Sequence, residues 1–593
     1  MTDDHLPHSD ISDILESRYF EKEQVSSLLM RMGARCVTLT REDMANLSVK
    51  NKGCIVFPKV LQEELRVISQ LGLKEVWLGA TASKHNRWKH SLGALTVGMA
   101  WLKAIMENSH DSLPSNGPLD KKAIMMLVGQ ALLLHDYGHL PFSHLLEEIL
   151  ATMNWIPISR DGSGLENITL DERLKGIDSI WPELANCLEE KQKIELNSQS
   201  VKRAVQALIH GDFGLPWIQA IVNSAIDADK IDYLGFDQEL LEDRGYPVNL
   251  RIRLGPPRPP VGVSASIPWL DEFLCDQRIN HVGLLCLSGR SAVAAADLIR
   301  ERVLFYDRFY LAPEIRVPER IAFEILQHFL IRSTMSLPFH RSIDEQYRSE
   351  KALADRARDR DWSGNVIREK CTAVRDQILK LVEKGKGEDR EFKILEYAFQ
   401  MVRDCERIDR KYLEFLERSF QMVNELKNDK SVSALKQLAD ESIVRQPIVI
   451  RREKYLDALE IIRPLQHEYC RDALIDLVKL PSALSAPRWG RFETESGRTE
   501  DVYAGILVPK GPVSTWGPGS RASVPLSSKA VSELERPYAR ICVISPGNAR
   551  SAKALYIWDR VRSTLLREDI NILEEGNDDA KRDKNLRHSI PNS

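Results

Sequence analysis

Apolar residues recur at helical spacing along most of the chain between about residues 21 and 335, and strand-like alternation is rare there. Within 90–107 they follow the i, i+3, i+4, i+7 rule, and the opposite flank is apolar too, which predicts a helix at the centre of a core. The apolar run 123–134 predicts a second buried helix, and 205–244 predicts further helices that are broken at 210–216. The pattern therefore predicts a mainly α core.

The second half of the chain has a different pattern. Residues 343–442 are dense in charge with helical periodicity, which favours long surface helices linked by i, i+4 ion pairs, and a surface for nucleic acid or a protein partner is the alternative. Residues 481–528 are rich in Pro, Gly and Ser and include a strand-like run, 502–509, which is echoed at 540–545 before a predicted helix, 551–567. The expected parts are, in order, a polar tail (1–20), a helical core (21–335), a charged helical region (336–480), a small α+β appendage (481–567) and a disordered tail (568–593).

Composition is that of an ordinary soluble globular protein, with 43% hydrophobic and 28% charged residues. A chain of 593 residues is too long for one hydrophobic core. The net charge of −4 gives no global attraction to nucleic acid or anionic membranes. The nine cysteines are scattered singly without a C-x-x-C pair, which predicts reduced thiols in a cytoplasmic protein. The longest apolar run is too short to span a bilayer, so no membrane partner is expected.

The dipeptide His135-Asp136 follows the apolar run and places two metal-ligating groups where a buried helix ends. Such a pair also arises by chance, and a second one, His110-Asp111, lies in a loop-like stretch without partners. The first pair differs because His90 lies upstream and the acidic stretch 227–232 lies downstream. Two imidazoles and two carboxylates suit a divalent metal ion such as Mn, Fe, Co, Ni or Zn, and Mg less well. The alternative is that both histidines are satisfied core residues.

Three stretches carry a family resemblance: 85–93 (HNRWKHSLG), 135–144 (HDYGHLPFSH) and 226–237 (IDADKIDYLGFD). They resemble the successive signatures of the HD-domain phosphohydrolases. The closest likeness is to the deoxynucleoside triphosphate (dNTP) triphosphohydrolase branch, which includes the bacterial dGTP enzymes and the sterile-alpha-motif/HD enzyme of animals. The lead-in around Gln70-Leu-Gly72 fits the same branch, and the resemblance covers about residues 50–335.

The resemblance implies a divalent metal ion whose ligands are His90, His135, Asp136 and Asp229. It also implies that His139 or His144 protonates the leaving oxygen, and that Arg87 holds the phosphate next to the sugar and takes part in catalysis. Of the other acids in the third stretch, Asp227 is expected to support the site from outside and Asp232 to be structural. The expected substrate contacts are Gln70, Leu71, Arg87, Lys230, Tyr233, Asp237, Arg302 and Tyr310.

Two departures from the family pattern concern the substrate and the proton donor. The animal branch has a His-Glu pair downstream of the HD helix that supplies the catalytic acid, whereas the candidate stretch 167–172 has no histidine and Glu147 stands in the place of the acid. The family's Tyr-x-His near Tyr310 reads Tyr-Leu-Ala here and is followed by Pro313. Without the His-Glu pair, proton donation would fall to His139 or be lost.

The resemblance thus implies a metal-dependent hydrolase that cleaves a dNTP into a deoxynucleoside and triphosphate. One alternative is an HD-type phosphodiesterase or nuclease, for which nucleic acid would be the substrate. Another is a regulatory module in which a degenerate HD site senses a nucleotide. By resemblance, a homo-oligomer is expected.

Overall fold

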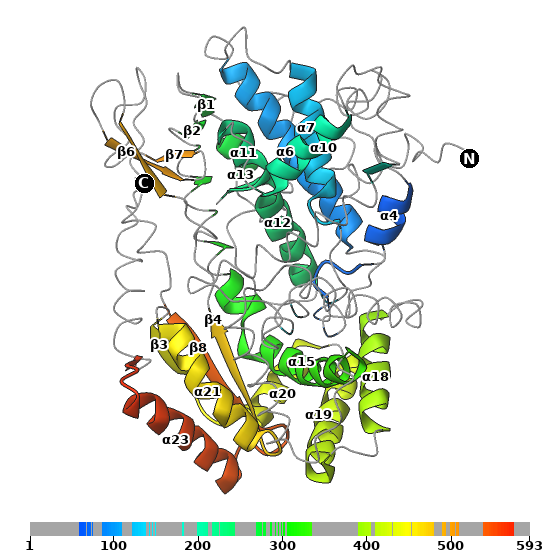
Figure 1. Ribbon diagram of the computed structural model, residues 1–593, viewed down its shortest axis with the longest axis vertical. Helices are drawn as coiled ribbons and strands as arrows, with labels where there is room; N and C mark the ends of the chain where they lie inside the picture. The colour runs from blue at the N-terminus through cyan, green and yellow to red at the C-terminus, as the bar shows by residue number, and fades with distance from the viewer. Residues whose placement is uncertain are drawn as a thin grey trace, which may run out of the picture.

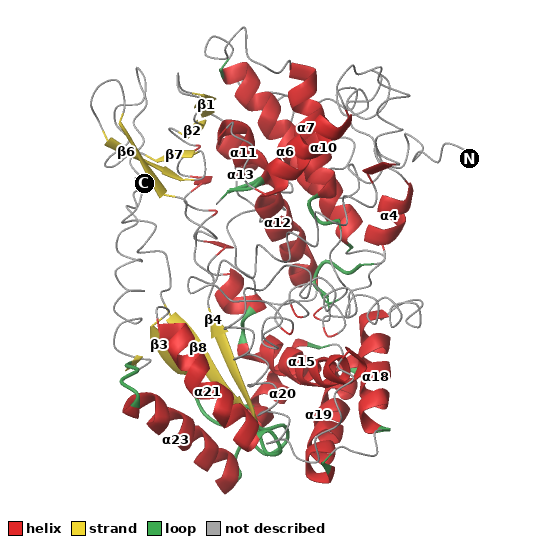
Figure 2. Cartoon of the chain, in the orientation of Figure 1, coloured by secondary structure: helices red, strands yellow, loops and turns green. Residues whose placement is uncertain are grey.

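The computed structural model describes the helices and strands that form the core, together with the turns that flank them. The described residues are 59–66, 68–72, 74, 77, 86–109, 121–137, 142, 145, 149, 181–182, 198–210, 216–224, 226–243, 269–274, 277–279, 285–287, 291, 294–295, 298, 301–302, 305–334, 390–404, 409–429, 431–451, 454–479, 489–493, 499–503, 506–508 and 538–573. Helices dominate these residues, as the sequence predicts (Figure 2).

Helix α6 (Arg87–Asn108) lies at the centre of the first group of helices (Figure 1). Apolar side chains on nearly all its sides are buried, which confirms the prediction of a central helix. At Gly98 a Cβ atom would lie 2.1 Å from Leu132 Cδ1 and 3.3 Å from Ala228 Cβ. Any larger residue would therefore force the Leu132 side chain to shift, so the glycine allows this close packing against two other helices. The helices packed around α6 or its neighbours are α4 (Lys59–Arg66), α7 (Lys121–Leu134), α10 (Ser198–His210), α11 (Pro216–Val222), α12 (Ala228–Asp243) and α13 (Trp269–Leu274).

A second group of helices follows a π-helical turn, η2 (Tyr306–Tyr310). Helix α15 (Pro313–Thr334) is its centre and contacts α18 (Arg390–Arg403), α19 (Arg410–Asn428) and α20 (Val432–Ser442). Buried apolar side chains run without interruption from the first group into the second, so one hydrophobic core joins them. The predicted helical periodicity of 391–428 is confirmed as two helices, α18 and α19.

The C-terminal part is a four-stranded antiparallel sheet in the order β4-β8-β3-β9. Along the chain its elements follow a β-α-β-β-α-β sequence, which with this strand order is the ferredoxin-like arrangement. Helices α21 and α23 pack together and contact the sheet through β4 and β8, with a separate apolar cluster between helices and sheet. The elements are β3 (Ile448–Arg451), α21 (Tyr455–Tyr469), β4 (Leu474–Lys479), β8 (Tyr538–Ile544), α23 (Ala552–Arg567) and β9 (Ile572–Leu573).

The small α+β part is therefore present, but it draws β3, α21 and β4 from residues before 481. Its last strand corrects one expectation: Ile572–Leu573 pair with β3, and the preceding Ile570 is buried. The prediction of disorder from residue 568 is wrong for this segment, because its few apolar residues are buried or pair with β3 as the edge strand of the sheet.

A second sheet joins distant parts of the chain, in the order β1-β2-β7-β6-β5. Strand β7 comes from the connection between β4 and β8 and pairs in parallel with β2 of the first half. The strand-like run 502–509 is thus divided between two antiparallel strands. The elements are β1 (Gln277–Ile279), β2 (Leu285–Leu287), β5 (Trp489–Glu493), β6 (Thr499–Tyr503) and β7 (Ile506–Val508).

Among the described helices, none combines the length and the apolar character needed to cross a membrane.

Candidate metal centre

The first turn of α6 carries two residues of the first motif. Asn86 begins the helix, because its side chain accepts a hydrogen bond from the Lys89 backbone N–H at 3.0 Å. This places Arg87 and His90 in the first turn on one side of the helix. Both are buried, with 3% and 1% of their surface exposed.

The second motif lies where α7 ends. His135 and Asp136 follow the last helical residue, Leu134, and form a turn. The Nδ1 atom of His135 lies 2.6 Å from the carbonyl oxygen of Leu132. Because a carbonyl only accepts, Nδ1 donates, and neutral His135 then presents an unprotonated Nε2 to the site.

The third motif begins α12. Asp227 caps this helix, since its carboxylate accepts the backbone N–H groups of Ser224 at 3.0 Å and Lys230 at 2.8 Å. Asp229 therefore lies in the first turn, and its side chain remains 31% exposed. Of the three residues that meet at the centre, Asp229 is the one accessible to a molecule arriving from solvent.

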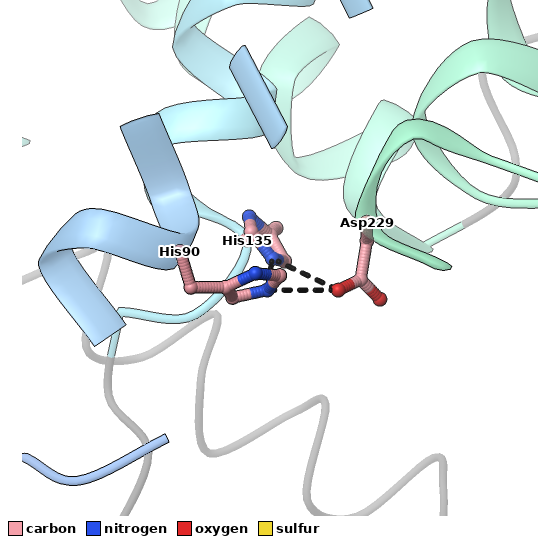
Figure 3. Close-up of side chains that lie close together, drawn as sticks. All are labelled: His90, His135 and Asp229. Carbon is pink, nitrogen blue, oxygen red and sulfur yellow. Dashed lines mark hydrogen bonds and ion pairs between the residues drawn. The ribbon is translucent and has the colours of Figure 1, made fainter. Parts of the chain in front are cut away.

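His90, His135 and Asp229 converge from these three elements (Figure 3). The distance from His90 Nε2 to Asp229 Oδ1 is 2.9 Å, and the two Nε2 atoms are 3.2 Å apart. The distance from His135 Nε2 to the same carboxylate oxygen is 3.5 Å. A metal ion bound at about 2.0–2.2 Å to nitrogen and oxygen separates its ligands by about 3 Å. These residues therefore form a group that could hold a metal ion.

The electrostatics of the centre favour a cation at Nε2 of His135. Burial lowers the pKa of His135, but the carboxylates of Asp136 and Asp229 outweigh it and raise the pKa to about 9. Burial raises the pKa of Asp229, but hydrogen bonds to His135 and His90 hold it well below the ordinary range. A proton or a metal ion at Nε2 is thus stabilised by the same carboxylates.

Asp136 lies beside this group and turns toward Arg87. Its Oδ2 is 2.6 Å from Arg87 Nη1 and 3.5 Å from His90 Nε2, and its Oδ1 is 3.7 Å from His135 Nε2. The structure thus brings all four expected ligands together, with the closest contacts among His90, His135 and Asp229.

Asp232 contacts His90, an expected ligand, directly, which the sequence did not predict. Its Oδ2 lies 2.7 Å from His90 Nδ1, and the side chain is fully buried. The signal was available in the spacing, because Asp232 follows Asp229 by three residues and shares its helix face. Asp227, expected to provide this support, instead caps α12 and pairs with the Lys230 ammonium.

The expected substrate contacts continue along α12. Asp229, Tyr233 and Asp237 are spaced by four residues and form a row about 12 Å long on one face. Opposite this row, Arg302 Nε donates to the Tyr233 hydroxyl at 3.0 Å, and the Tyr310 hydroxyl donates to Asp237.

Tyr310 ends the π-helical turn η2, a feature that is frequent at functional sites. Burial raises the pKa of its hydroxyl, and the neighbouring Asp237 carboxylate raises it further, so Tyr310 stays protonated and donates. Gln70 and Leu71 lie in a turn ahead of α6. The expected proton donors, His139 and His144, lie outside the described residues, as does Glu147.

Comparison with known proteins gives short and distant matches. No family model matches the chain. It is 24% identical over 175 residues to the uncharacterized protein YwfO of Bacillus subtilis, a match covering 30% of this chain and 33% of that protein. It is 29% identical over 180 residues to an uncharacterized MG461 homolog of Mycoplasma pneumoniae, covering 29% and 35%. The matches thus span about a third of the length of these curated relatives.

Among solved structures, a phosphohydrolase from Bacteroides thetaiotaomicron aligns with a TM-score of 0.41 and 15% identity. The alignment covers 82% of this chain and 93% of that one.

Proposed function

We propose that the chain is a metal-dependent phosphohydrolase of the HD type and that it cleaves dNTPs into a deoxynucleoside and triphosphate. The observation that carries the proposal is the convergence of His90, His135 and Asp229 from three separate helix ends. Both histidines have Nδ1 engaged by a protein oxygen and Nε2 directed at the shared carboxylate. This arrangement suits ligands of one metal ion better than two satisfied core histidines.

When bound, a divalent metal ion supplies a Lewis acid and lowers the pKa of a water molecule. The chain's own groups supply the rest. The Arg87 guanidinium, 2.6 Å from Asp136, lies next to the ligands and would hold the phosphate nearest the sugar. Lys230 follows Asp229 on α12 and would offset charge farther along the phosphates. His139 or His144 would return a proton to the leaving oxygen.

The row along α12 supports a deoxynucleotide as substrate. Asp237 would accept a hydrogen bond from the sugar 3′-hydroxyl, and Tyr310, which contacts Asp237, would crowd the 2′ position. Tyr233 lies in the middle of the row, and Arg302 contacts it from the opposite side, where the phosphates would lie. Gln70 and Leu71 would contact the sugar.

The test is a panel of the four dNTPs and four NTPs incubated with the full chain and Mn or Mg. We expect inorganic triphosphate from dNTPs, lost in Asp229→Ala and retained in Glu396→Gln, a control on the exposed face of α18. Absence of product with every nucleotide and metal would refute the triphosphohydrolase. Cleavage of single-stranded DNA or RNA instead would identify a phosphodiesterase. Nucleotide binding without turnover would identify a sensing module.

Mass photometry of the same sample tests the homo-oligomer that the resemblance implies.

A further inference from the structure

The turn at residues 68–72 is attached to the start of α6. The backbone N–H of Arg87 donates to the carbonyl of Ile68 at 3.0 Å, and Ser69 forms an isolated β-bridge with Asn86. The turn is therefore joined to the first turn of the helix that carries His90. The turn also presents residues 70–71, the expected sugar contacts, so its position matters twice for the candidate site.

The same turn rests on the second motif. Gly72 has φ +61° and lies against the backbone of Phe142, to which an added Cβ would come within 3.6 Å. Phe142 itself has φ 67°, a conformation that few non-glycine residues adopt. Within the turn, the Ser69 hydroxyl donates to the Gly72 carbonyl at 3.2 Å. The turn is thus fitted between the motif that begins α6 and the motif that follows α7.

Two buried carboxylates from the second group of helices hold this turn from outside. Glu391 Oε1, on α18, accepts the Ser69 backbone N–H at 3.3 Å. Glu319, on α15, forms an ion pair with the Lys74 ammonium just after the turn. Each glutamate is only 4% exposed. A buried carboxylate is costly unless its partners are fixed, so these contacts resist displacement.

Glu319 is in turn linked to the C-terminal sheet. Its Oε2 lies 3.5 Å from Arg316 Nη1, and Arg316 makes a two-point contact with Asp476 of β4, with distances of 3.1 and 2.8 Å. Asp476 is 1% exposed. A chain of buried charged groups therefore connects the sheet, through α15, with Lys74.

We propose that Glu319 and Glu391 are positioning residues, which hold the 68–72 turn and with it residues 70–71 in register with the metal centre. Neither glutamate touches the metal ligands in any described contact; they act through Lys74 and Ser69. The second half of the chain thereby contributes to substrate binding at a site formed by the first half. The kinetic consequence rests on the proposed function, whereas the structural consequence does not.

The variants separate the contacts from the fold. Glu391→Ala removes the acceptor for the Ser69 N–H, while Glu391→Gln keeps an acceptor oxygen. Glu319→Gln removes the charge that pairs with Lys74. Glu396→Ala, on the exposed face of the same α18 helix, is the matched control. Each full-length variant is analysed by hydrogen–deuterium exchange of the peptide that covers the turn, by Mn affinity and by steady-state kinetics with dNTPs.

We expect amide exchange at the turn to be about tenfold faster in Glu391→Ala, the loss expected for one hydrogen bond, and unchanged in Glu396→Ala and Glu391→Gln. The KM for dNTP should rise about 10-fold in Glu391→Ala and Glu319→Gln with Mn affinity unchanged, because a displaced turn loses a contact that binds the substrate equally in the ground state and the transition state. If Glu391→Ala fails to fold, Glu319→Gln carries the test.

Unchanged exchange at the turn in Glu391→Ala and Glu319→Gln would overturn the proposal, whatever the enzyme's activity. So would a loss of kcat with an unchanged KM. If no dNTP is cleaved by the wild type but exchange changes as expected, the positioning of the turn stands and the proposed function fails.

Discussion

Replacement of Asp232 by asparagine tests whether the histidines at the centre are metal ligands. The Asp232 carboxylate lies 2.7 Å from His90 Nδ1, and both side chains are buried, with 0% and 1% exposed. Asparagine keeps an oxygen that accepts the same hydrogen bond but removes the negative charge. The ring then stays in place, while His90 Nε2 becomes a weaker electron donor.

Loss of such a partner costs about 10-fold to 100-fold in metal affinity, which corresponds to about 1.4–2.7 kcal/mol. We expect the upper end for Asp232→Asn, because the contact is shielded from solvent and its charge is not screened. Asp227→Asn is the matched control: asparagine keeps the cap on the Lys230 backbone N–H but weakens the contacts with the Ser224 N–H and the Lys230 ammonium. It thus perturbs the start of α12 without changing the His90 contact, so metal affinity should stay within about threefold of wild type.

The assay is calorimetric titration of Mn into the metal-free full-length proteins, with thermal unfolding of the same samples to show that they are folded. Equal Mn affinity in Asp232→Asn and wild type would show that His90 is not a metal ligand supported by Asp232. So would an equal loss in Asp227→Asn, because the effect would then arise from α12 as a whole and not from the His90 contact.

Other predictions concern stability. Burial raises the pKa of Glu324, but contacts with His328, Arg320 and Tyr412 outweigh it and lower the pKa from 4.5 to about 2. The ionised carboxylate therefore stabilises the folded state above about pH 4.5, and this stabilisation is lost as the pH falls toward 2. Urea titrations should therefore show wild type losing about 3 kcal/mol more than Glu324→Gln across that window; parallel pH profiles would contradict this. Gly98→Ala should lower the free energy of unfolding by about 1–3 kcal/mol, since the new Cβ meets Leu132 at 2.1 Å, and an unchanged Tm would argue against the close packing. Asp476→Ala should cost about 3–5 kcal/mol by removing the two-point carboxylate contact of buried Arg316, and a loss below 1 kcal/mol in urea unfolding would show that this contact is not needed.

Local sequence patterns predicted the parts of the site that are set by single helices. Apolar periodicity predicts α6, and the apolar run 123–134 predicts α7. The positions of His90 and His135 near helix ends could therefore be inferred. The row formed by Asp229, Tyr233 and Asp237 follows from helical spacing alone.

Contacts between distant residues were beyond these patterns. Lys74 and Glu319 are 245 positions apart, and any of many acids could have been the partner of this lysine. Helical spacing places Asp232 on the same face as Asp229 but does not show which ring its carboxylate reaches, so the contact with His90 is not predicted.

The ferredoxin-like arrangement was missed in part because its first strand, β3, has only four residues, and because α21 contains Pro464, a residue that usually marks the end of a helix. The apolar run 502–509 predicts one strand, because such a run does not reveal where a hairpin turns. Strand pairing depends on partners that lie far away in sequence, as β2 and β7 do.

Metal analysis of the purified full chain shows whether His90, His135 and Asp229 bind a metal ion. Each preparation is stripped with EDTA, reloaded with Mn, Fe or Zn, desalted, and analysed by inductively coupled plasma mass spectrometry. We expect one bound ion per chain at the group formed by His90, His135 and Asp229. The ion should be lost in His90→Ala and in Asp229→Ala but kept in Glu396→Gln. Wild-type protein that retains no metal, or alanine variants that retain as much as wild type, would contradict it.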